Sequence, residues 1–357
     1  MKTIPSGKKI IVLSISMFTV MILIWRVNSV SYSGWDATLV TVNHEPVTQR
    51  EFKQVLSKQR SDVYSYFQRK YGASDNKDFW THNYEGEVPI EIARKRALDT
   101  IVRIKVEQLL AREKGVMDNI HDAHFLKKLK NENKRRQEAV ANNQVIYGPT
   151  TYSESGYFQY IHSNMVLRVK QLMMEENISM ETLRHFYEDR KETYRLEDQI
   201  RIHKIAISLL DEAGHDDQKI KEKSQEQLKI MKDQWAHGVY YDDFLNKYKH
   251  TDHLDMTYEE VTFDKNDPNL QERVDHVYDI SKTLTIGQVS SIIEDKDSVA
   301  IIKVVAIEPQ GYRPLDEVMY HVQSSYIDET YQQLIDQLVK EADVRIHENM
   351  YKKIKLR

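Results

Sequence analysis

Two apolar runs between residues 284 and 304 predict a β-hairpin and constrain the fold of the region around them. A turn at Gly287 precedes the run Val289 to Ile293, and a charged stretch separates it from the run Val299 to Val305. Runs of this length, rich in Val and Ile and bounded by turn residues, are typical of strands. We therefore expect this hairpin to complete a small antiparallel sheet.

The amino terminus has the pattern of an export signal. Three lysines precede Ile10 to Trp25, which contains no charged residue, and Arg26 follows it. This run is slightly shorter than the roughly 20 residues of a spanning helix and longer than many signal-peptide cores. We expect residues 1 to 26 to be an uncleaved transmembrane anchor, with a cleaved signal peptide as the alternative. The positive-inside rule places the rest of the chain outside the cytoplasm, either on a single-pass membrane protein or secreted.

Charge and composition exclude several classes of protein. The chain has no cysteine, which excludes disulfides, thiolate metal sites and a cysteine nucleophile. Beyond residue 26 it carries 47 basic and 55 acidic side chains, a net charge of about −8, which opposes nucleic-acid binding. The basic run Lys127 to Arg136 is interpreted as a solvated helix face.

No motif indicates a metal or a cofactor. His250, Asp252, His253 and Asp255 resemble a metal cluster in composition only. The chain has no HExxH, no glycine-rich phosphate loop and no G-x-S-x-G. We expect neither a metal nor a cofactor.

The segment VTVNHEPVTQREF carries the first family resemblance. Thr38 to Val42 predicts a strand, residues 43 to 46 a turn, and Thr48 with Glu51 a capping box that begins a helix from about 49 to 70. This opening resembles the SurA, PrsA and PpiD group of periplasmic or cell-surface foldases, in which the turn usually reads Val-Asn-Gly. His44 occupies the position of that glycine, and Asn and His tolerate positive φ better than most residues.

The hairpin carries the second resemblance, to the last strands of parvulin-type peptidyl-prolyl isomerases. Together the two imply an α+β fold in which a mainly helical SurA-type chaperone domain, residues 36–195, is completed by residues 312–357. A parvulin-like domain, residues 198–308, would be inserted as a small antiparallel sheet flanked by helices. In the family the carboxy-terminal element returns to the helical domain, so we expect a strand at 344–346 beside Thr38 to Val42. Helices are expected at about 92–113, 118–143, 157–175, 180–194, 217–237 and 315–341, and a strand at 200–209.

The parvulin site is the candidate active site, and the residues at its two histidine positions are not histidines. The family's first strand aligns with residues 200–207 and places Lys204 at the first histidine, while His203 lies on the opposite face. The family's last strand places Ala300 at the second histidine, and Asp255 is a possible acid of the site. The resemblance predicts that Phe263, Val277 and Tyr278 line an apolar substrate pocket.

The function implied by the resemblance is that of a membrane-tethered, extracytoplasmic foldase or chaperone for exported proteins. It would hold unfolded or partly folded exported chains in an apolar cradle between its domains and be weak or inactive as an isomerase. One alternative is an active parvulin-type isomerase that tolerates the lost histidines. Another is a non-catalytic interaction protein with one fixed partner in an envelope or spore complex.

Overall fold

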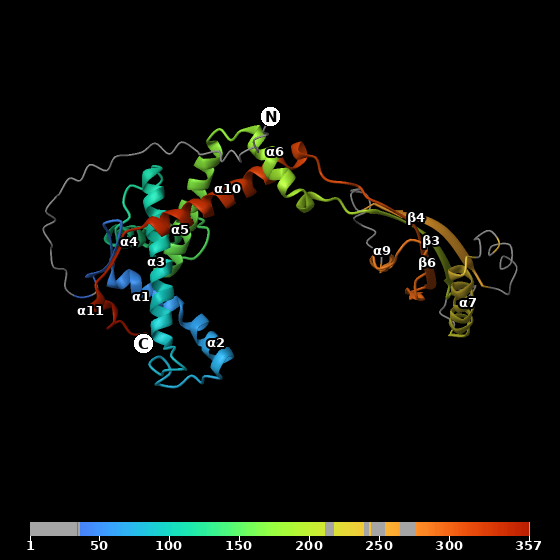
Figure 1. The fold of residues 1–357 in the computed structure, drawn as a ribbon, viewed down its shortest axis with the longest axis horizontal. Coiled ribbons are helices and arrows are strands. Elements are labelled where there is room, and N and C mark those ends of the chain that lie inside the picture. The colour runs from blue at the N-terminus through green and yellow to red at the C-terminus, as the bar shows by residue number, and fades with distance from the viewer. Residues whose placement is uncertain are drawn as a thin grey trace, which may run out of the picture. The chain divides into compact units, whose positions relative to one another are not determined.

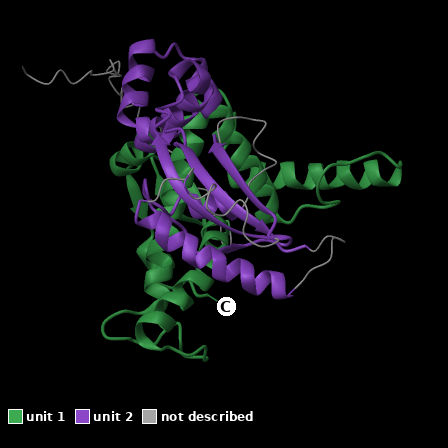
Figure 2. Cartoon of the chain, turned by 90° about the vertical axis from the view of Figure 1, so that its right-hand side faces the viewer, with its two compact units in different colours: residues 1–169, 334–357 green, residues 170–333 purple. Residues whose placement is uncertain are grey.

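The chain divides into two units (Figure 2). A computed structural model describes residues 34, 36–210, 218–238, 243, 254–264 and 276–356. Unit 1 comprises Met1–Val169 with Leu334–Arg357, and unit 2 comprises Lys170–Gln333. The expected anchor, residues 1–26, lies outside the described residues, and none of the described helices is long and apolar enough to cross a membrane.

The sheet of unit 1 joins the two ends of the described chain. Strands β1 (Thr38–Val42), β2 (Glu45–Thr48) and β7 (Val344–Ile346) lie in the order β2-β1-β7. β7 is antiparallel to β1, with Val42 opposite Val344 and Val40 opposite Ile346. The expected pairing of residues 344–346 with 38–42 is confirmed. Because β7 follows α10 (Leu315–Glu341), unit 1 is assembled from chain segments about 300 residues apart.

The β1–β2 hairpin has a two-residue turn. Asn43 and His44 both have positive φ, 47° and 68°, as a type I′ turn requires. The expectation of positive φ at His44 is confirmed. The turn is shorter than the one expected at residues 43 to 46. Pro46 already lies in β2, opposite Thr41. β2 is an edge strand, where the missing N–H of proline removes no ladder hydrogen bond.

The helices of unit 1 begin at the predicted capping box. The Thr48 hydroxyl accepts a hydrogen bond from the Glu51 amide at 3.1 Å, and the Glu51 carboxylate accepts one from the Thr48 amide at 2.7 Å. The helix expected from 49 to 70 is two helices, because the chain breaks at Gln59 without a glycine or proline to signal it. The helices of this part of the chain are α1 (Gln49–Lys58), α2 (Arg60–Tyr71), α3 (Pro89–Glu113), α4 (Asp122–Ala141), α5 (Glu154–Glu175) and α11 (Glu348–Tyr351).

Helix α3 is the centre of unit 1, and α1 and α2 pack against it (Figure 1). Its side chains at Ala93 and Ala97 are fully buried, and their small size lets neighbouring elements approach closely. Pro89 occupies its first turn, where no intrahelical N–H is needed. The helix expected at 92–113 is confirmed and begins three residues earlier.

The sheet of unit 2 is antiparallel, in the order β4-β3-β6-β5. Its strands are β3 (Gln199–Ser208), β4 (Met256–Phe263), β5 (Ile293–Glu294) and β6 (Ser298–Glu308). The predicted hairpin is present, although its first strand is reduced to β5 and a single bridge from Val289 to Lys303. The sequence analysis did not predict β4. As an edge strand, β4 tolerates the charges of Glu259 and Glu260 that obscured its pattern.

Helices cover both faces of this sheet. On one face, α7 (Gln218–Ala236) contributes Leu228, Met231 and Trp235 to a core with Ile205 and Ile301. On the other, α9 (His276–Ser281) contributes Val277 and Tyr278 to a core that includes Ile202, Phe263, Ile302 and Val304. A third apolar cluster of unit 2 joins α6 (Met180–Asp189), the 3-10 helix η1 (Lys191–Tyr194) and α10. Residues 170–195, which the sequence analysis grouped with the helical domain, lie in unit 2.

Candidate functional site

The predicted isomerase positions lie on the α9 face of the sheet. In the register of β3 and β6, Lys204 lies opposite Ile302 and Ala206 lies opposite Ala300. Paired residues share a face, so Lys204 and Ala300 are near neighbours there. His203 lies on the other face, where its ring contacts Tyr258 and its Nε2 is 3.1 Å from Glu260. The equivalence of Lys204 and Ala300 to the family's histidines stays a prediction.

The two replacements differ in their environments. The Lys204 ammonium pairs with Glu259 on the neighbouring strand at 4.0 Å, and its side chain is 22% exposed. Because this ion pair lies near the surface, it contributes at most about 1 kcal/mol. Ala300 is 4% exposed, directly between Ala206 and Ile293 of the adjacent strands. This face therefore carries one screened cation and one methyl group at the two positions that the resemblance assigns to the family's imidazoles.

The predicted substrate-binding residues are part of the core. Phe263, Val277 and Tyr278 are 5%, 7% and 3% exposed, and the rings of Phe263 and Tyr278 meet edge to face at 5.3 Å. The Tyr278 hydroxyl donates a hydrogen bond to Glu197, and burial together with this bond raises its pKa. Their role as substrate contacts stays a prediction. In this structure their apolar surface is covered by the chain itself.

Asp255 lies at the start of β4, at the opposite end of that strand from Phe263. It is exposed, and its carbonyl oxygen accepts a hydrogen bond from the Ser208 amide at 2.9 Å. The structure therefore does not bring it together with the apolar residues predicted to line the pocket. His250, Asp252 and His253 lie outside the described residues, so the predicted absence of a metal site stays a prediction.

Unit 1 contains a cavity of about 400 Å³ between α1, α3, α4 and α5. Sites for small ligands usually measure roughly 300–1,000 Å³ and are mainly apolar. Phe125 of α4 and Phe158 of α5 meet edge to face, with 6.0 Å between ring centroids, and Phe125 also stacks on Tyr157 at 5.8 Å. The other apolar residues of the wall are Val55, Ile101, Ile104, Val116, Met117, Ile120, Ile161 and Met165. This is apolar surface that the described chain leaves unfilled.

Buried ion pairs hold the wall of this cavity. Lys105 of α3 is 1% exposed, and its ammonium pairs with Glu51 at 2.9 Å and donates to the carbonyl of Ile120 at 3.2 Å. The Glu51 carboxylate therefore makes two contacts: it accepts the capping-box hydrogen bond of α1 and pairs with Lys105. On the same wall, Arg50 pairs with Asp122 at the start of α4 and Glu154 at the start of α5. Four helices are thus fixed around the cavity by charges that neutralise one another.

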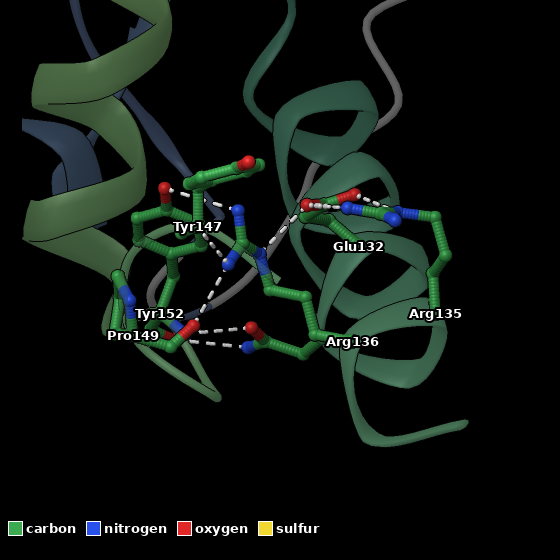
Figure 3. Close-up of polar contacts among 7 residues, drawn as sticks. Glu132, Arg135, Arg136, Tyr147, Pro149 and Tyr152 are labelled. Atoms are coloured by element: carbon green, nitrogen blue, oxygen red, sulfur yellow. Dashed lines mark hydrogen bonds and ion pairs between the residues drawn. The ribbon is translucent and has the colours of Figure 1, made fainter. Parts of the chain in front are cut away.

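A second uncovered apolar surface lies beyond α4, in the loop that leads to α5. Figure 3 shows the Arg136 guanidinium directed at this loop, where it donates to the carbonyls of Tyr147 and Pro149 at 2.9 and 2.8 Å. The same guanidinium lies over the Tyr152 ring at 4.5 Å. The side chain of Tyr147 is nevertheless 88% exposed and that of Val145 is 83% exposed. The loop is thus held in one conformation with its apolar side chains in solvent.

Glu132 completes the arrangement around Arg136. Its carboxylate accepts hydrogen bonds from Arg135 at 2.7 and 2.8 Å and from Arg136 at 2.8 Å. The bonds from Arg135, followed by those from Arg136, lower the pKa of Glu132 to about 2. The basic run Lys127 to Arg136, interpreted from sequence as a solvated face, therefore includes a buried arginine that organises the loop.

Sequence reasoning missed the cavity and the Arg136 loop. The cavity combines residues from four helices, and no single segment has a spacing that predicts it. Phe125 was the available signal, because it is a phenylalanine in a helix rich in charged side chains. No sequence pattern singled out Tyr147.

The known proteins to which this chain is similar include chaperones. No protein-family model matches the chain. A chaperone for lacto-N-biosidase from Bifidobacterium longum subsp. longum is 24% identical over 114 residues, which are 32% of this chain. The match spans 41% of the length of that relative.

Solved structures give a similar result. A structure of the SurA-like chaperones PEB4 and Cj1289 from Campylobacter jejuni matches 87% of this chain and 98% of its own, at 14% identity and a TM-score of 0.32. The peptidylprolyl isomerase PrsA from Bacillus cereus matches 90% of this chain and 95% of its own, at 13% identity and a TM-score of 0.22. The chain is similar to SurA- and PrsA-type chaperones, as its motifs predicted.

Proposed function

We propose that the protein is an extracytoplasmic chaperone, tethered to the membrane by residues 1 to 26, that binds unfolded or partly folded exported polypeptides and is silent as a prolyl isomerase. The observation that carries the proposal is the apolar cavity of about 400 Å³ in the helical unit. Unfolded chains expose apolar side chains that a folded protein buries, and a cavity with aromatic walls removes such side chains from water.

The isomerase part of the proposal is supported by the sheet face. Rotation about an X-Pro bond must overcome a barrier of about 18–20 kcal/mol. A pair of imidazoles supplies hydrogen bonds near the proline pocket in parvulins, whereas Ala300 has no polar side-chain atom and the ammonium of Lys204 pairs with Glu259. Binding without isomerisation is the function that these residues support best.

Aggregation suppression tests the chaperone part. We expect the full-length protein to slow the aggregation of a chemically unfolded client, and Phe125→Ser to weaken this effect several-fold by placing a hydroxyl in the aromatic wall. Ile230→Ser is the matched control, because Ile230 is also apolar and exposed, on α7, and does not line the cavity. Equal loss in the two variants, or no suppression by the wild type, would refute the proposed client site.

A prolyl-isomerase assay tests the catalytic part. We expect the wild type to isomerise an X-Pro peptide at close to the uncatalysed rate. The comparison is with the double variant Lys204→His, Ala300→His, which restores the two imidazoles if the assigned register is functional. Strong activity in the wild type would show that the protein is an active isomerase, the alternative left open by the sequence.

Determining the mature amino terminus tests whether residues 1 to 26 are retained as a membrane anchor. We expect intact mass measurement of the protein from its native membrane fraction to find residues 1 to 26 retained. A mature terminus between Val30 and Ser33 would instead show a cleaved signal and a released protein.

A further inference from the structure

Two lysines lie beside the aromatic pair that lines the helical cavity. Lys58 is the last residue of α1, and its Nζ lies 6.0 Å from the centroid of the Phe158 ring. Lys128 lies three residues after Phe125 on α4, so these two side chains share one side of that helix. Both lysines line the cavity and both are exposed to solvent. They therefore mark the edge at which the apolar cavity opens.

The acids that line the cavity already have basic partners. Glu51 pairs with Lys105, whereas Asp122 and Glu154 share Arg50. Leaving aside the two histidines of the wall, four basic side chains, the two edge lysines included, therefore face three acidic ones. The excess is positive, and it lies on the two lysines at the edge.

The edge lysines have no acidic partner among the residues that the structure describes. Glu132 follows Lys128 by four residues, a spacing that often gives an ion pair on a helix. Its carboxylate instead accepts hydrogen bonds from Arg135 and Arg136. The ammonium groups of both edge lysines can therefore pair with an anionic group that a ligand brings.

The other polar residues of the wall favour a polypeptide ligand. Gln54, Gln59 and Asn164 line the cavity. An amide side chain both donates and accepts hydrogen bonds, so it can pair with a peptide group. A hydrocarbon chain would cover these amides without giving them partners, which costs free energy. The aromatic and aliphatic walls favour an apolar side chain on that polypeptide.

We propose that the cavity prefers segments of unfolded clients in which a large apolar side chain is flanked by acidic residues. The apolar side chain packs on the wall of Phe125 and Phe158, and the carboxylates pair with Lys58 and Lys128 at the edge. This inference rests on the proposed function, because the segment belongs to a client polypeptide. Beyond residue 26 the chain has a net charge of about −8, so its overall charge repels acidic segments. The preference is therefore a local effect of the two lysines.

The test compares two peptides that differ only in charge. Each has blocked ends and one phenylalanine, which is flanked by glutamates in the first peptide and by glutamines in the second. We expect the full-length protein to bind the glutamate peptide about twofold to tenfold more tightly at low ionic strength, the range expected for two exposed ion pairs. The preference should shrink in about 1 M salt, where the Debye length is about 3 Å. Equal affinities at low ionic strength, or tighter binding of the glutamine peptide, would overturn the proposal.

The double variant Lys58→Gln, Lys128→Gln tests whether these two lysines cause the preference. Both side chains are exposed, so the variant should keep the thermal midpoint of the wild type and bind the glutamine peptide as before. Its preference for the glutamate peptide should disappear. The matched control is Lys127→Gln with Lys130→Gln, which removes the same charge from exposed positions of α4 that do not line the cavity. A preference that persists in the first variant, or that the control loses equally, would reject the role of the edge lysines.

A fatty acid is another ligand that combines apolar surface with a carboxylate. Dodecanoate is the probe for this alternative, in the same titration as the two peptides. Weaker binding of dodecanoate than of the glutamate peptide supports a polypeptide ligand. Tighter binding, with displacement of the peptide, would assign the cavity to a fatty acid and overturn the proposal.

Failure of the inference is distinguishable from failure of the proposed function. If the wild type suppresses aggregation but binds the two peptides equally, the chaperone function stands and the preference for acidic segments is wrong. If it distinguishes the peptides but does not suppress aggregation, the proposed function is wrong and the assignment to client segments falls with it. Suppression that weakens in the edge-lysine variant for an acidic client, and not for a neutral one, supports both.

Discussion

The sheet face of unit 2 and the cavity of unit 1 are both rich in apolar side chains, but only the cavity is left open. On the sheet, Phe263, Val277 and Tyr278 cover one another and are at most 7% exposed. In the helical unit, Phe125 and Phe158 line a space of about 400 Å³ that the described chain does not fill. Apolar composition therefore does not identify a binding surface. What distinguishes the two regions is whether the chain covers its own apolar side chains.

The two regions also differ in what holds them. The sheet face depends on packing between strands and α9, with the ion pair of Lys204 and Glu259 at its margin. The cavity wall depends on buried charges, among them Lys105 with Glu51 and Arg50 with Asp122. An unfilled apolar space loses the contacts that would otherwise stabilise it. Ion pairs that position the helices provide part of that stability and leave the apolar walls free for a ligand.

The largest expected effect comes from removing the segment that closes unit 1. Deleting residues 343–357 removes β7 and Ile354, which is 1% exposed, and takes away the carbonyls that accept three hydrogen bonds from Arg94. Burial of one such side chain contributes about 1.5–3 kcal/mol, and hydrogen bonds to a charged group about 1.5–3 kcal/mol. We expect unit 1 to lose more than about 4 kcal/mol and the sheet of unit 2 to keep its stability.

Hydrogen exchange on the full chain and the truncated chain measures this difference. Protection of residues 98–110 in α3 should fall, and protection of β3 and β6 should not. The control is Arg345→Ala, which removes an exposed side chain of β7 and leaves the strand in place. Unchanged protection of α3 after the deletion would contradict the assembly of unit 1 from both chain ends.

The next prediction tests whether the buried ion pairs of the cavity wall contribute to the stability of unit 1. Lys105→Ala leaves Glu51 in a largely buried position without its counter-ion, and breaking a buried pair in this way costs about 3–5 kcal/mol. Glu51 keeps its bond to the Thr48 amide and is 16% exposed, so we expect the lower end of that range. Denaturant unfolding should show the loss.

Lys70→Ala is the matched control for this prediction. Lys70 also pairs with a glutamate, Glu87 at 3.3 Å, but both side chains are substantially exposed. Exposed pairs contribute little to stability, so the control should unfold close to the wild type. Similar losses in the two variants would show that burial of the Lys105 pair is not what holds the cavity wall.

A pair of enlarging substitutions tests whether one region is filled and the other open. Ala300→Leu adds volume to a site that is 4% exposed, and overpacking of this kind typically costs about 1–3 kcal/mol. Ile104→Phe adds volume where the side chain faces the cavity, so we expect it to change stability by less than about 1 kcal/mol and to weaken client binding. The free energy of unfolding of both variants measures the contrast. A tolerated leucine at position 300 would indicate an open proline pocket on the sheet.

Much of the fold could be predicted from local signals. The capping box of Thr48 and Glu51 and the positive φ at His44 depend on a few neighbouring residues whose chemistry is specific. The pairing of 344–346 with 38–42 joins distant segments, and only the family resemblance predicted it. β4 was missed because an edge strand with Glu259 and Glu260 does not show the apolar alternation that marks a half-buried strand.

The candidate sites were harder to predict for a physical reason. Lys204 and Ala300 could be placed on one face because strand residues alternate, so the register is sufficient. The cavity depends on how far apart four helices are held, and the ion pairs that set this distance join residues as distant in sequence as Glu51 and Lys105. Lys128 belongs to a basic run that reads as a solvated helix face. Its position at the cavity is visible only once the neighbouring helices are in place.

The smallest expected effect is a loosening of the loop around Arg136 at low pH. Hydrogen bonds from Arg135 and Arg136 lower the pKa of Glu132 from 4.5 to about 2, so its ionised form is favoured in the folded state. Its contribution is fully present above about pH 4.5 and is lost as the pH falls towards 2. Over that interval Arg136 loses one acceptor and keeps the carbonyls of Tyr147 and Pro149, so the loop should loosen without unfolding. Because Glu132 lies near the surface, solvent screens the effect.

Amide chemical shifts of residues 147 and 152 measured from pH 6 to pH 2 should change in the wild type and much less in Glu132→Gln. The sheet face is held by apolar packing, so amides of β6 should not follow the same titration. Parallel shifts in β6 would mean that charge stabilises both regions alike, and the contrast between them would fail.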